Sequence, residues 1–463
     1  MEFPRIIIAA PGSGQGKTTF SMGLMAALCK RGMKVQPYKV GPDYIDPAFH
    51  TAITGRSSIN LDSWLLEDDY IKDMFWRYSQ EADISVVEGV MGLYDGMEGD
   101  PMKGSTAGIA KLLDAPVILI MQAAGMSASA AAVVNGFRDF GGLNIAGVVI
   151  NRPSSANHYN SVKAAVERYS DVKVLGYIPN EDKISLKSRH LGLVQSCETE
   201  ELNSIVDRLA ALIEDNVDVA AILDISRGGG TNSAGGSFEY HPSRIIKPEQ
   251  RVKIAVALDK AFNFYYHENF RILESLGAEL QYFSPLEDKK LPEGCSGLYI
   301  GGGYPEVFAE QLEANISMRE DILHNANEGL PIYAECGGYM YLNKNITTPE
   351  GKTYKFVGIF DGEAEMTGKL QNFGYAELEF VEDNYLLNKG EKVRIHEFHR
   401  SIVKRPQEKT VVRVKKQRGY RVDEWDCGMT RANVIGFYPH VYFPSNIKLA
   451  ESYIQKCMEY KNR

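Results

Sequence analysis

The sequence predicts an α/β protein built from two domains. Short β-rich runs such as RIIIAA, DISVVEG and PVILIM alternate with segments of helical composition in the first half, which is typical of a mostly parallel sheet covered by helices. The alternation stops in a Gly-, Ser- and Pro-rich stretch and restarts at RVKIAVALD. We therefore expect a first domain at residues 1–225, a linker at 226–250 and a second domain at 251–463.

Composition and charge exclude several classes of protein. Of 463 residues, 44% are hydrophobic and 24% are charged, which is ordinary for a folded globular chain and not for a disordered or collagen-like one. The formal net charge of −9 argues against a broad nucleic-acid-binding surface. Six scattered cysteines without a CxxC pair indicate neither a disulfide framework nor a zinc ribbon. With neither a signal peptide nor a membrane span in the sequence, we expect a cytoplasmic protein.

A phosphate-binding loop is predicted where the first strand ends. The stretch PGSGQGKTT follows this strand and precedes an apolar helical segment. Glycines allow backbone N–H groups to surround phosphate oxygens, the lysine adds a mobile cation, and the threonine can bind Mg²⁺. Pro11 stands at the first position of the GxxxxGK[ST] spacing, so the loop is a variant. The expected ATP-binding residues of this loop are Gly12, Gly14, Gly16, Lys17 and Thr18.

Four carboxylates follow strands of the first domain. Glu88 ends DISVVEG, Asp43 and Asp46 lie in KVGPDYIDP, and Asp95 lies in VMGLYDG. At the carboxyl edge of a parallel sheet such groups suit Mg²⁺ binding, recognition of a metal-bound phosphate or placement of an acceptor. Asp before Pro or Gly is also an ordinary turn former, so both interpretations stay open. Asn151, after the strand IAGVVI, is either an adenine-binding residue or a simple loop residue.

In the second domain, a cysteine nucleophile is predicted on a tight turn. LPIYAECGGYMYL leads a strand into Cys336, then two glycines and a probable helix, which is the geometry of a nucleophile elbow. His440 in GFYPHVYF is the candidate base. The candidate oxyanion hole consists of backbone N–H groups of Gly302, Gly303 and Gly337.

Two further patterns bear on this site. Tyr442 stands two residues after His440, so local spacing shows no carboxylate for a triad and we predict a Cys-His dyad. HEFH at 396–399 is one residue short of the HExxH spacing of zinc proteases, and we reject a metalloprotease. From Thr353 onward, KFVGIF, TVVRVKK and NVIGFY predict an antiparallel or mixed extension of the second sheet.

The order of these motifs resembles the cobyrinic acid a,c-diamide synthase family of glutamine-dependent amidotransferases. The blocks GSGQGKT, KVGPDYIDP, VEGVMGLYDG, GGGYPE, AECGGYMYL, HEFH and YPHVYF follow one another along nearly the whole chain. The resemblance implies an N-terminal P-loop NTPase-type domain with a parallel sheet, and a C-terminal class I glutamine amidotransferase-like α/β domain. Arg400 stands where the family pattern HEFHYS has tyrosine, and Ile395 stands where glycine is usual.

The resemblance also implies an activity. ATP, Mg²⁺ and glutamine would serve to amidate the a and c acetate groups of cobyrinic acid, a corrinoid tetrapyrrole, in cobalamin biosynthesis. Cys336 would be the glutaminase nucleophile and His440 the residue that activates it. Thr18 and Glu88 would bind Mg²⁺. Acceptor binding or activation would fall to the residues Asp43, Tyr44, Asp46 and Asp95.

Two alternatives stay open. Ni-sirohydrochlorin a,c-diamide synthase shares the domain plan and the chemistry; Met91 and the GPD before Tyr44 favour the corrinoid enzyme. A ParA- or MinD-like switch ATPase would use the GKT motif but would leave Cys336 and His440 without a role. An assay of glutamine hydrolysis distinguishes the switch ATPase, which would not hydrolyse glutamine, from an amidotransferase.

Overall fold

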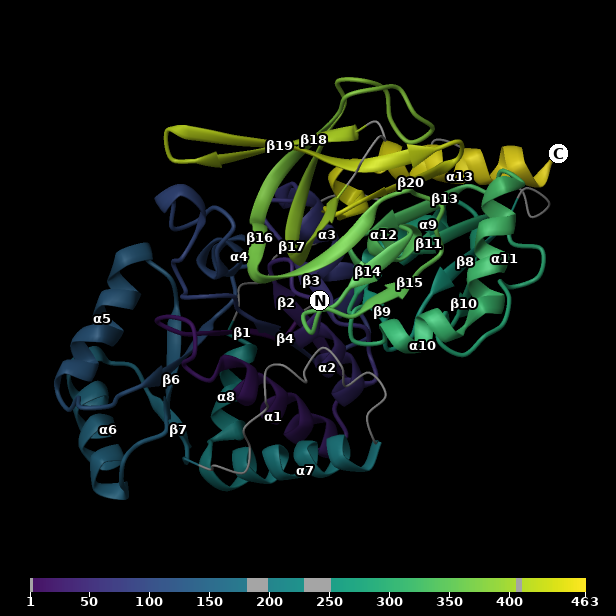
Figure 1. The fold of residues 1–463 in the computed structure, drawn as a ribbon. Coiled ribbons are helices and arrows are strands. Elements are labelled where there is room, and N and C mark those ends of the chain that lie inside the picture. Colours follow the sequence, from purple (N-terminus) through teal and green to yellow (C-terminus); the bar gives the residue numbers. More distant parts are fainter. Residues whose placement is uncertain (1–2, 181–198, 229–250, 405–409) are drawn as a thin grey trace. The chain divides into compact units, whose positions relative to one another are not determined.

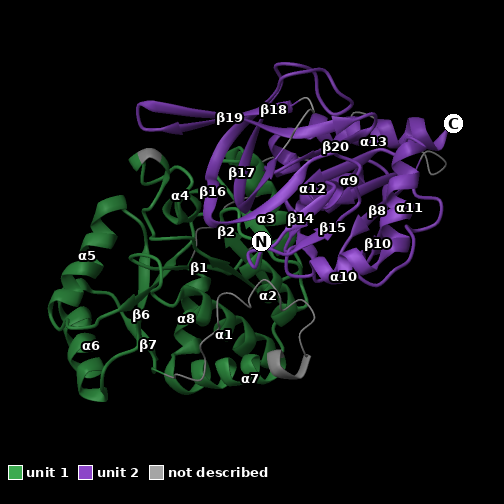
Figure 2. Cartoon of the chain, viewed as in Figure 1, with its two compact units in different colours: residues 1–191, 197–239 green, residues 192–196, 240–463 purple. Residues whose placement is uncertain are grey.

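The computed structural model describes residues 3–180, 199–228, 251–404 and 410–463 (Figure 1). The chain divides into two compact units, one of residues 1–191 and 197–239 and one of residues 192–196 and 240–463 (Figure 2). Residues 229–250 of the predicted linker lie outside the described residues. The predicted domain limits therefore stay predictions. Within the described ranges, no helix combines the length and the apolar character needed to cross a membrane.

A parallel sheet of seven strands forms the centre of the first unit, in the order β3-β2-β4-β1-β5-β6-β7. This sheet confirms the predicted α/β class. The strands are β1 (Arg5–Ala9), β2 (Val35–Val40), β3 (Ile59–Leu61), β4 (Ile84–Glu88), β5 (Val117–Gln122), β6 (Ile145–Asn151) and β7 (Val174–Ile178). Since β1, β2 and β4 are neighbours, the loops at their carboxyl ends meet at one edge of the sheet.

Helices alternate with these strands. They are α1 (Lys17–Lys30), α2 (Ile45–Thr54), α3 (Asp68–Ser79), the short 3₁₀ turn η1 (Met97–Gly99), α4 (Thr106–Leu112), α5 (Ser129–Gly141), α6 (Ala156–Ser170), α7 (Thr199–Asn216) and α8 (Val219–Ser226). All five residues of β1 are buried, as expected for a strand covered on both faces. Ile6 and Ile8 pack in one core with Leu24 of α1 and Ile213 of α7. This core holds the start of α1, and with it the phosphate loop, against the sheet.

The second unit combines a parallel sheet with an antiparallel extension. Strands β10, β8, β11, β13 and β20 run parallel in this order, and β19, β18 and β16 continue the sheet with antiparallel pairing. β14 pairs parallel to β16 and antiparallel to β15, while β17 pairs antiparallel to β16 and β21. β9 and β12 form a separate small antiparallel pair. The predicted mixed extension is confirmed.

The strands of this unit are β8 (Val252–Ala257), β9 (Phe262–Phe264), β10 (Ala278–Phe283), β11 (Gly297–Ile300), β12 (Gly302–Gly303), β13 (Ile332–Glu335), β14 (Asn345–Thr347), β15 (Thr353–Lys355), β16 (Glu363–Phe380), β17 (Lys392–Lys404), β18 (Thr410–Arg418), β19 (Arg421–Arg431), β20 (Val434–Phe437) and β21 (His440–Val441). The helices are α9 (His267–Ser275), α10 (Ala309–Ala314), α11 (Ile316–Asn327), α12 (Gly337–Leu342), the 3₁₀ turn η5 (Phe443–Ser445) and α13 (Ile447–Lys461).

One strand prediction in this unit was wrong. Of KFVGIF only Lys355 lies in a strand, and residues 356–360 form an irregular connection. Phe356, Ile359 and Phe360 are nevertheless buried in the core of the unit. The apolar run therefore predicted burial correctly but not the strand. Apolar side chains can be buried in a core from an irregular segment as well as from a strand.

Candidate active sites of the two units

The predicted phosphate loop lies between β1 and α1, with α1 starting at Lys17. Gly16 has a φ of 98°, and a Cβ placed there would lie 2.3 Å from Asn151 Nδ2, so the position requires glycine. Asn151, at the end of β6, donates from Nδ2 to the Gln15 carbonyl at 2.7 Å. It thus holds the loop backbone, and its predicted adenine contact stays a prediction. A Cβ at Gly12 or Gly14 would meet no atom within 4 Å, which leaves open space beside the loop.

Lys17 is buried over its own loop. Its Nζ donates to the carbonyl of Gly12 at 3.3 Å and to that of Met91. Burial, and then the charge of Lys39, lower the pKa of this lysine. Among the described residues, Lys17 is therefore a partly desolvated cation whose hydrogen bonds go only to carbonyl oxygens, which it can exchange for phosphate oxygens.

A buried cluster of charged side chains lies at the carboxyl edge of the sheet. Thr18 Oγ1 donates to Glu88 Oε1 at 2.7 Å, and Lys39 Nζ lies 2.9 Å from the same oxygen and 2.5 Å from Asp46 Oδ2. His50 Nε2 lies 2.8 Å from Glu88 Oε2. The structure therefore brings together the predicted residues Thr18, Asp46 and Glu88, and adds Lys39 and His50, which sequence reasoning missed.

Electrostatics within this cluster are governed by burial and by Lys39. Burial alone would lower the pKa of Lys39, but the carboxylates of Glu88, Asp46 and Asp43 together raise it. For Glu88, burial acts to raise the pKa, and Lys39, His50 and Thr18 outweigh it and hold the pKa below its usual range. Burial and the charge of Glu88 raise the pKa of Asp46. Lys39 is thus a fully charged lysine that neutralises a buried acidic site.

Asp43 and Asp95 serve the backbone as well as facing the site. Asp43 Oδ1 accepts from the N–H groups of Ile45 and Asp46 at 2.8 and 3.2 Å, and so begins α2, while its Oδ2 lies 3.8 Å from Lys39 Nζ. Asp95 Oδ2 accepts from the Gly92 N–H at 2.8 Å. The turn-forming role therefore holds for both residues. Tyr44, between Asp43 and α2, is half-buried at the helix start.

The oxygen atoms present at this edge fit a Mg²⁺ ion that also binds phosphates. Within the described ranges, no group of three or more His, Cys, Asp or Glu side chains could hold a metal by itself. Mg²⁺ at a phosphate site usually takes one or two protein ligands, and phosphate oxygens and water complete its shell. Thr18 Oγ1 and Glu88 Oε1, 2.7 Å apart, are suitable ligands of that kind.

Cys336 of the second unit stands between β13 and α12 in a strained conformation, with φ 47° and ψ −105°. Such backbone geometry in a non-glycine residue is typical of a nucleophile elbow. A Cβ at Gly338 would lie 2.2 Å from the Ile300 carbonyl oxygen, so the turn fits only with glycine there. Cys336 is 5% exposed. Burial, and then the charge of Glu306, raise the pKa of its thiol above the usual range.

Next to this elbow lies the predicted oxyanion loop. A Cβ at Gly337 would lie 3.0 Å from the backbone N of Gly303. On the other side, a Cβ at Gly302 would lie 2.5 Å from His440 Cε1. Gly302 and Gly303 are therefore packed between the elbow and the imidazole, and the three predicted glycines and both predicted catalytic residues lie in one region.

Glu335 is the residue of this site that sequence reasoning missed. It ends β13, is 2% exposed, and its Oε2 lies 3.7 Å from His440 Nδ1. Its Oε1 accepts from Tyr333 Oη at 2.5 Å and from the Val441 N–H at 3.1 Å. A carboxylate directly before the cysteine in AECGG was a visible signal, but only β13–β21 packing places it beside the histidine.

The HEFH segment lies on β17, where His396 pairs with His440 across the β17–β21 ladder. His399 Nε2 lies 2.7 Å from Glu397 Oε1, and its ring stacks on Tyr438 with 3.8 Å between centroids. Burial, then the charge of His440, lower the pKa of His396 to about 3. His399 is therefore held by hydrogen bonds and ring stacking, and His396 is a buried neighbour of His440.

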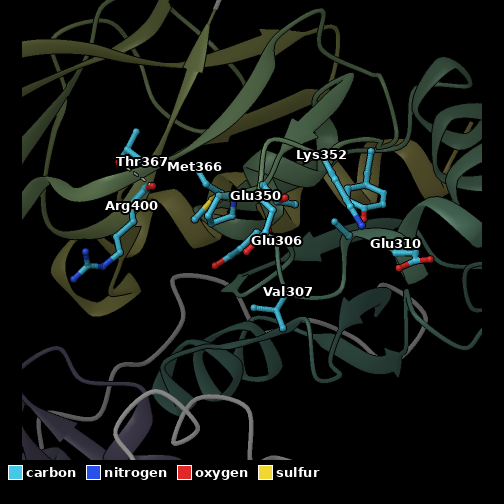
Figure 3. A pocket seen from close by; sticks show the side chains of 12 residues that line it. Glu306, Val307, Glu310, Glu350, Lys352, Met366, Thr367 and Arg400 are labelled. Atoms are coloured by element: carbon cyan, nitrogen blue, oxygen red, sulfur yellow. Dashed lines mark hydrogen bonds between the residues drawn. The ribbon is translucent and has the colours of Figure 1, made fainter.

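A cavity of about 580 Å³ lies within the second unit (Figure 3). Its lining includes Glu306 from the GGGYPE turn, Arg400 from β17 and Met366 from β16. The segment 348–352, which joins β14 to β15, supplies Glu350 and Lys352. The cavity therefore has both acidic and basic groups at its wall.

Taken together, a phosphate loop in one unit and a cysteine elbow in the other define a nucleotide-dependent glutamine amidotransferase. Residues 6–194 match the CobQ/CobB/MinD/ParA nucleotide binding domain, and residues 253–447 match the CobB/CobQ-like glutamine amidotransferase domain. The chain belongs to the cobyrinate a,c-diamide synthase family.

Relatives of that name cover nearly the whole chain. The cobyrinate a,c-diamide synthase of Listeria monocytogenes serotype 4b is 47% identical over 446 residues, which are 96% of this chain and 97% of the relative. That of Thermoplasma volcanium is 43% identical over 463 residues, 100% of this chain and 99% of the relative. That of Caldanaerobacter subterraneus is 41% identical and covers 98% of each chain.

Proposed function

We propose that this protein uses ATP and glutamine to amidate the a and c acetate groups of cobyrinic acid in cobalamin biosynthesis. The observation that carries the proposal is that one chain holds both a phosphate loop and a cysteine elbow, in two units. Full-length similarity to cobyrinate a,c-diamide synthases supports it, and favours an amidotransferase over a switch ATPase, for which the second unit would have no role. We also propose a cytoplasmic location.

In the glutaminase half-reaction, the Cys336 sulfur attacks the side-chain amide carbon of glutamine. His440 takes the thiol proton and delivers it to the departing nitrogen, which leaves as ammonia. Backbone N–H groups of Gly303 and Gly337 stabilise the oxyanion of the tetrahedral intermediate. Water then hydrolyses the thioester, so that the products are glutamate and ammonia.

Glu335 orients His440 in this proposal. A base of this kind needs a group that holds the far nitrogen of the ring, and Glu335 Oε2 is a buried carboxylate oxygen 3.7 Å from Nδ1. Tyr333 Oη and the Val441 N–H hold the other carboxylate oxygen. In this proposal Glu335, at the end of the strand before Cys336, is the third member of the triad. The position two residues after His440, which is Tyr442, does not supply it.

In the synthetase half-reaction, an acetate oxygen of the acceptor takes the γ-phosphoryl group of ATP and forms an acyl phosphate, and ADP leaves. Ammonia then attacks the acyl carbon and phosphate departs, which yields the amide. Lys17 and the N–H groups around Gly12, Gly14 and Gly16 hold the phosphates, and Thr18 and Glu88 bind Mg²⁺. When bound, Mg²⁺ neutralises phosphate charge. Lys39 keeps the surrounding carboxylates neutralised.

Acceptor binding is proposed for the neighbouring residues of the same sheet edge. Asp43, Tyr44 and Asp46 follow β2, Asp95 follows β4, and β4 lies between β2 and β1 in the sheet. The acceptor carries several carboxylates, so cations of this edge must offset its repulsion from the acidic residues. Lys17 and Lys39 are buried lysines near these carboxylates.

The deciding experiment offers purified protein cobyrinic acid or Ni-sirohydrochlorin, each with ATP, Mg²⁺ and glutamine, and compares product masses. We expect the diamide of cobyrinic acid. Diamidation of Ni-sirohydrochlorin alone would favour the alternative substrate, and ATP hydrolysis with no glutamine consumption would contradict an amidotransferase.

A further inference from the structure

Glu306 lies in the wall of the cavity of the second unit and close to the nucleophile. It follows Pro305, whose Cδ lies 2.9 Å from the Cβ position of Gly337, the residue after Cys336. Figure 3 shows Glu306 among the cavity side chains, together with Arg400, Glu350 and Lys352. The charge of Glu306 reaches the Cys336 thiol and is the strongest single charge acting on it. Glu306 therefore belongs both to the wall of the cavity and to the electrostatic surroundings of the nucleophile.

Among the residues that the structure describes, the carboxylate of Glu306 has no counter-ion. Within the described ranges it makes no ion pair or side-chain hydrogen bond, and its own backbone N–H is the one group that stabilises its charge. It is half-buried, whereas Glu310 and Glu350 of the same wall are exposed. Burial raises the pKa of Glu306 to about 7. A desolvated carboxylate without a partner is costly, and a cation brought by a ligand would remove that cost.

We propose that Glu306 binds the α-ammonium group of glutamine in this cavity and thereby selects α-amino acid amides. The proposal rests on the glutaminase function proposed above and adds the group that recognises the substrate. In glutamine the ammonium lies a short aliphatic chain away from the amide carbon that Cys336 attacks, which suits a carboxylate beside the elbow. Arg400 lines the same cavity and offers a cation for the α-carboxylate.

The same contact links substrate binding to activation of the nucleophile. In the free protein the negative charge of Glu306 opposes ionisation of Cys336. An ammonium group bound to Glu306 cancels that charge, so the thiolate forms more readily once glutamine is in place. The thiol is therefore kept protonated, and less open to oxidation, until substrate arrives.

The test compares hydrolysis of glutamine with that of glutaramate, the amide that lacks the α-ammonium group, in the presence of ATP and acceptor. For Glu306→Gln we expect kcat/KM for glutamine to fall about 10- to 100-fold, the loss of one charge-assisted hydrogen bond. Hydrolysis of glutaramate should not fall, because this amide has no ammonium group for Glu306 to bind. Glu310→Gln, which alters an exposed glutamate of the same wall, is the matched control and should resemble the unaltered protein.

Equal losses for both amides in Glu306→Gln would overturn the proposal, since they would show a role that does not involve the ammonium group. If the unaltered protein hydrolyses neither amide, the glutaminase function itself fails, which is a different result. A second measurement needs no turnover: the pH dependence of Cys336 alkylation, followed by peptide mass spectrometry. Glu306→Gln should shift this curve to lower pH, and an unchanged curve would contradict the electrostatic link.

Discussion

At the scale of the residue, the second unit places a buried carboxylate beside the candidate base, from a strand that local spacing does not indicate. Tyr442 occupies the position where a local pattern would put a carboxylate, and Glu335 approaches His440 Nδ1 from β13 instead. Such an orienting group acts on the ring and not on the substrate. Its removal should therefore lower the rate of the chemical step more than it weakens glutamine binding.

For Glu335→Gln we expect kcat of glutamine hydrolysis to fall about 10- to 100-fold, the usual effect of losing an orienting partner, while KM changes little. Glu335→Asp keeps the charge and should recover part of the rate. Glu397→Gln is the control, because it removes a buried carboxylate from His399 and not from His440. A rise in KM at constant kcat would contradict the positioning role.

In the first unit, Lys39 is the residue whose charge depends on buried partners. It is 3% exposed and contacts Asp46 and Glu88. For Lys39→Met, two buried carboxylates lose their cation, and we expect the unit to be destabilised by about 3–5 kcal/mol. Thermal unfolding should show a lower Tm, and Lys39→Met combined with Asp46→Asn should recover part of it. An unchanged Tm would show that the cluster is solvated and not buried.

At the scale of the element, the short β9–β12 pair positions the predicted oxyanion loop. Gly303 has a φ of 154°, and a Cβ there would lie 2.0 Å from the Ala261 carbonyl oxygen, so its backbone is fixed against β9. Gly302 then faces His440, and no side chain fits between them. Glycine at this position allows the backbone to pack closely against the His440 imidazole.

Gly302→Ala should therefore displace His440 and abolish most glutamine hydrolysis, while ammonium-dependent amidation by the first unit continues. The matched control is Gly368→Ala on β16, where an added Cβ would meet no atom within 4 Å. Rates with glutamine and with ammonium chloride, measured side by side, check this. Full glutamine-dependent activity in Gly302→Ala would show that the loop backbone can move to accept the added methyl group without displacing the imidazole of His440.

At the scale of the whole molecule, the two half-reactions belong to two compact units. Cys336→Ala should lose amidation from glutamine and keep amidation from ammonium salts, because the phosphate loop is untouched.

Lys17→Ala should lose amidation from both nitrogen sources, because activation of the acceptor precedes ammonia capture. Product masses from the two nitrogen sources give the answer. Ammonium-dependent turnover by Lys17→Ala at the normal rate would contradict the phosphate-loop assignment.

The sequence by itself determined the α/β class, the phosphate loop, the cysteine elbow and the family resemblance. These features are local: glycine spacing, the residues beside a nucleophile and strand patterns are set by backbone conformations of neighbouring residues. The positions of Lys39, His50, Glu335 and Glu306 relative to their partners were decided only by the tertiary structure. Their roles depend on burial and on partners far away in the chain, such as His50 with Glu88 and Glu335 with His440. Packing decides which charges lose water and which cations offset them, and no local pattern contains that information.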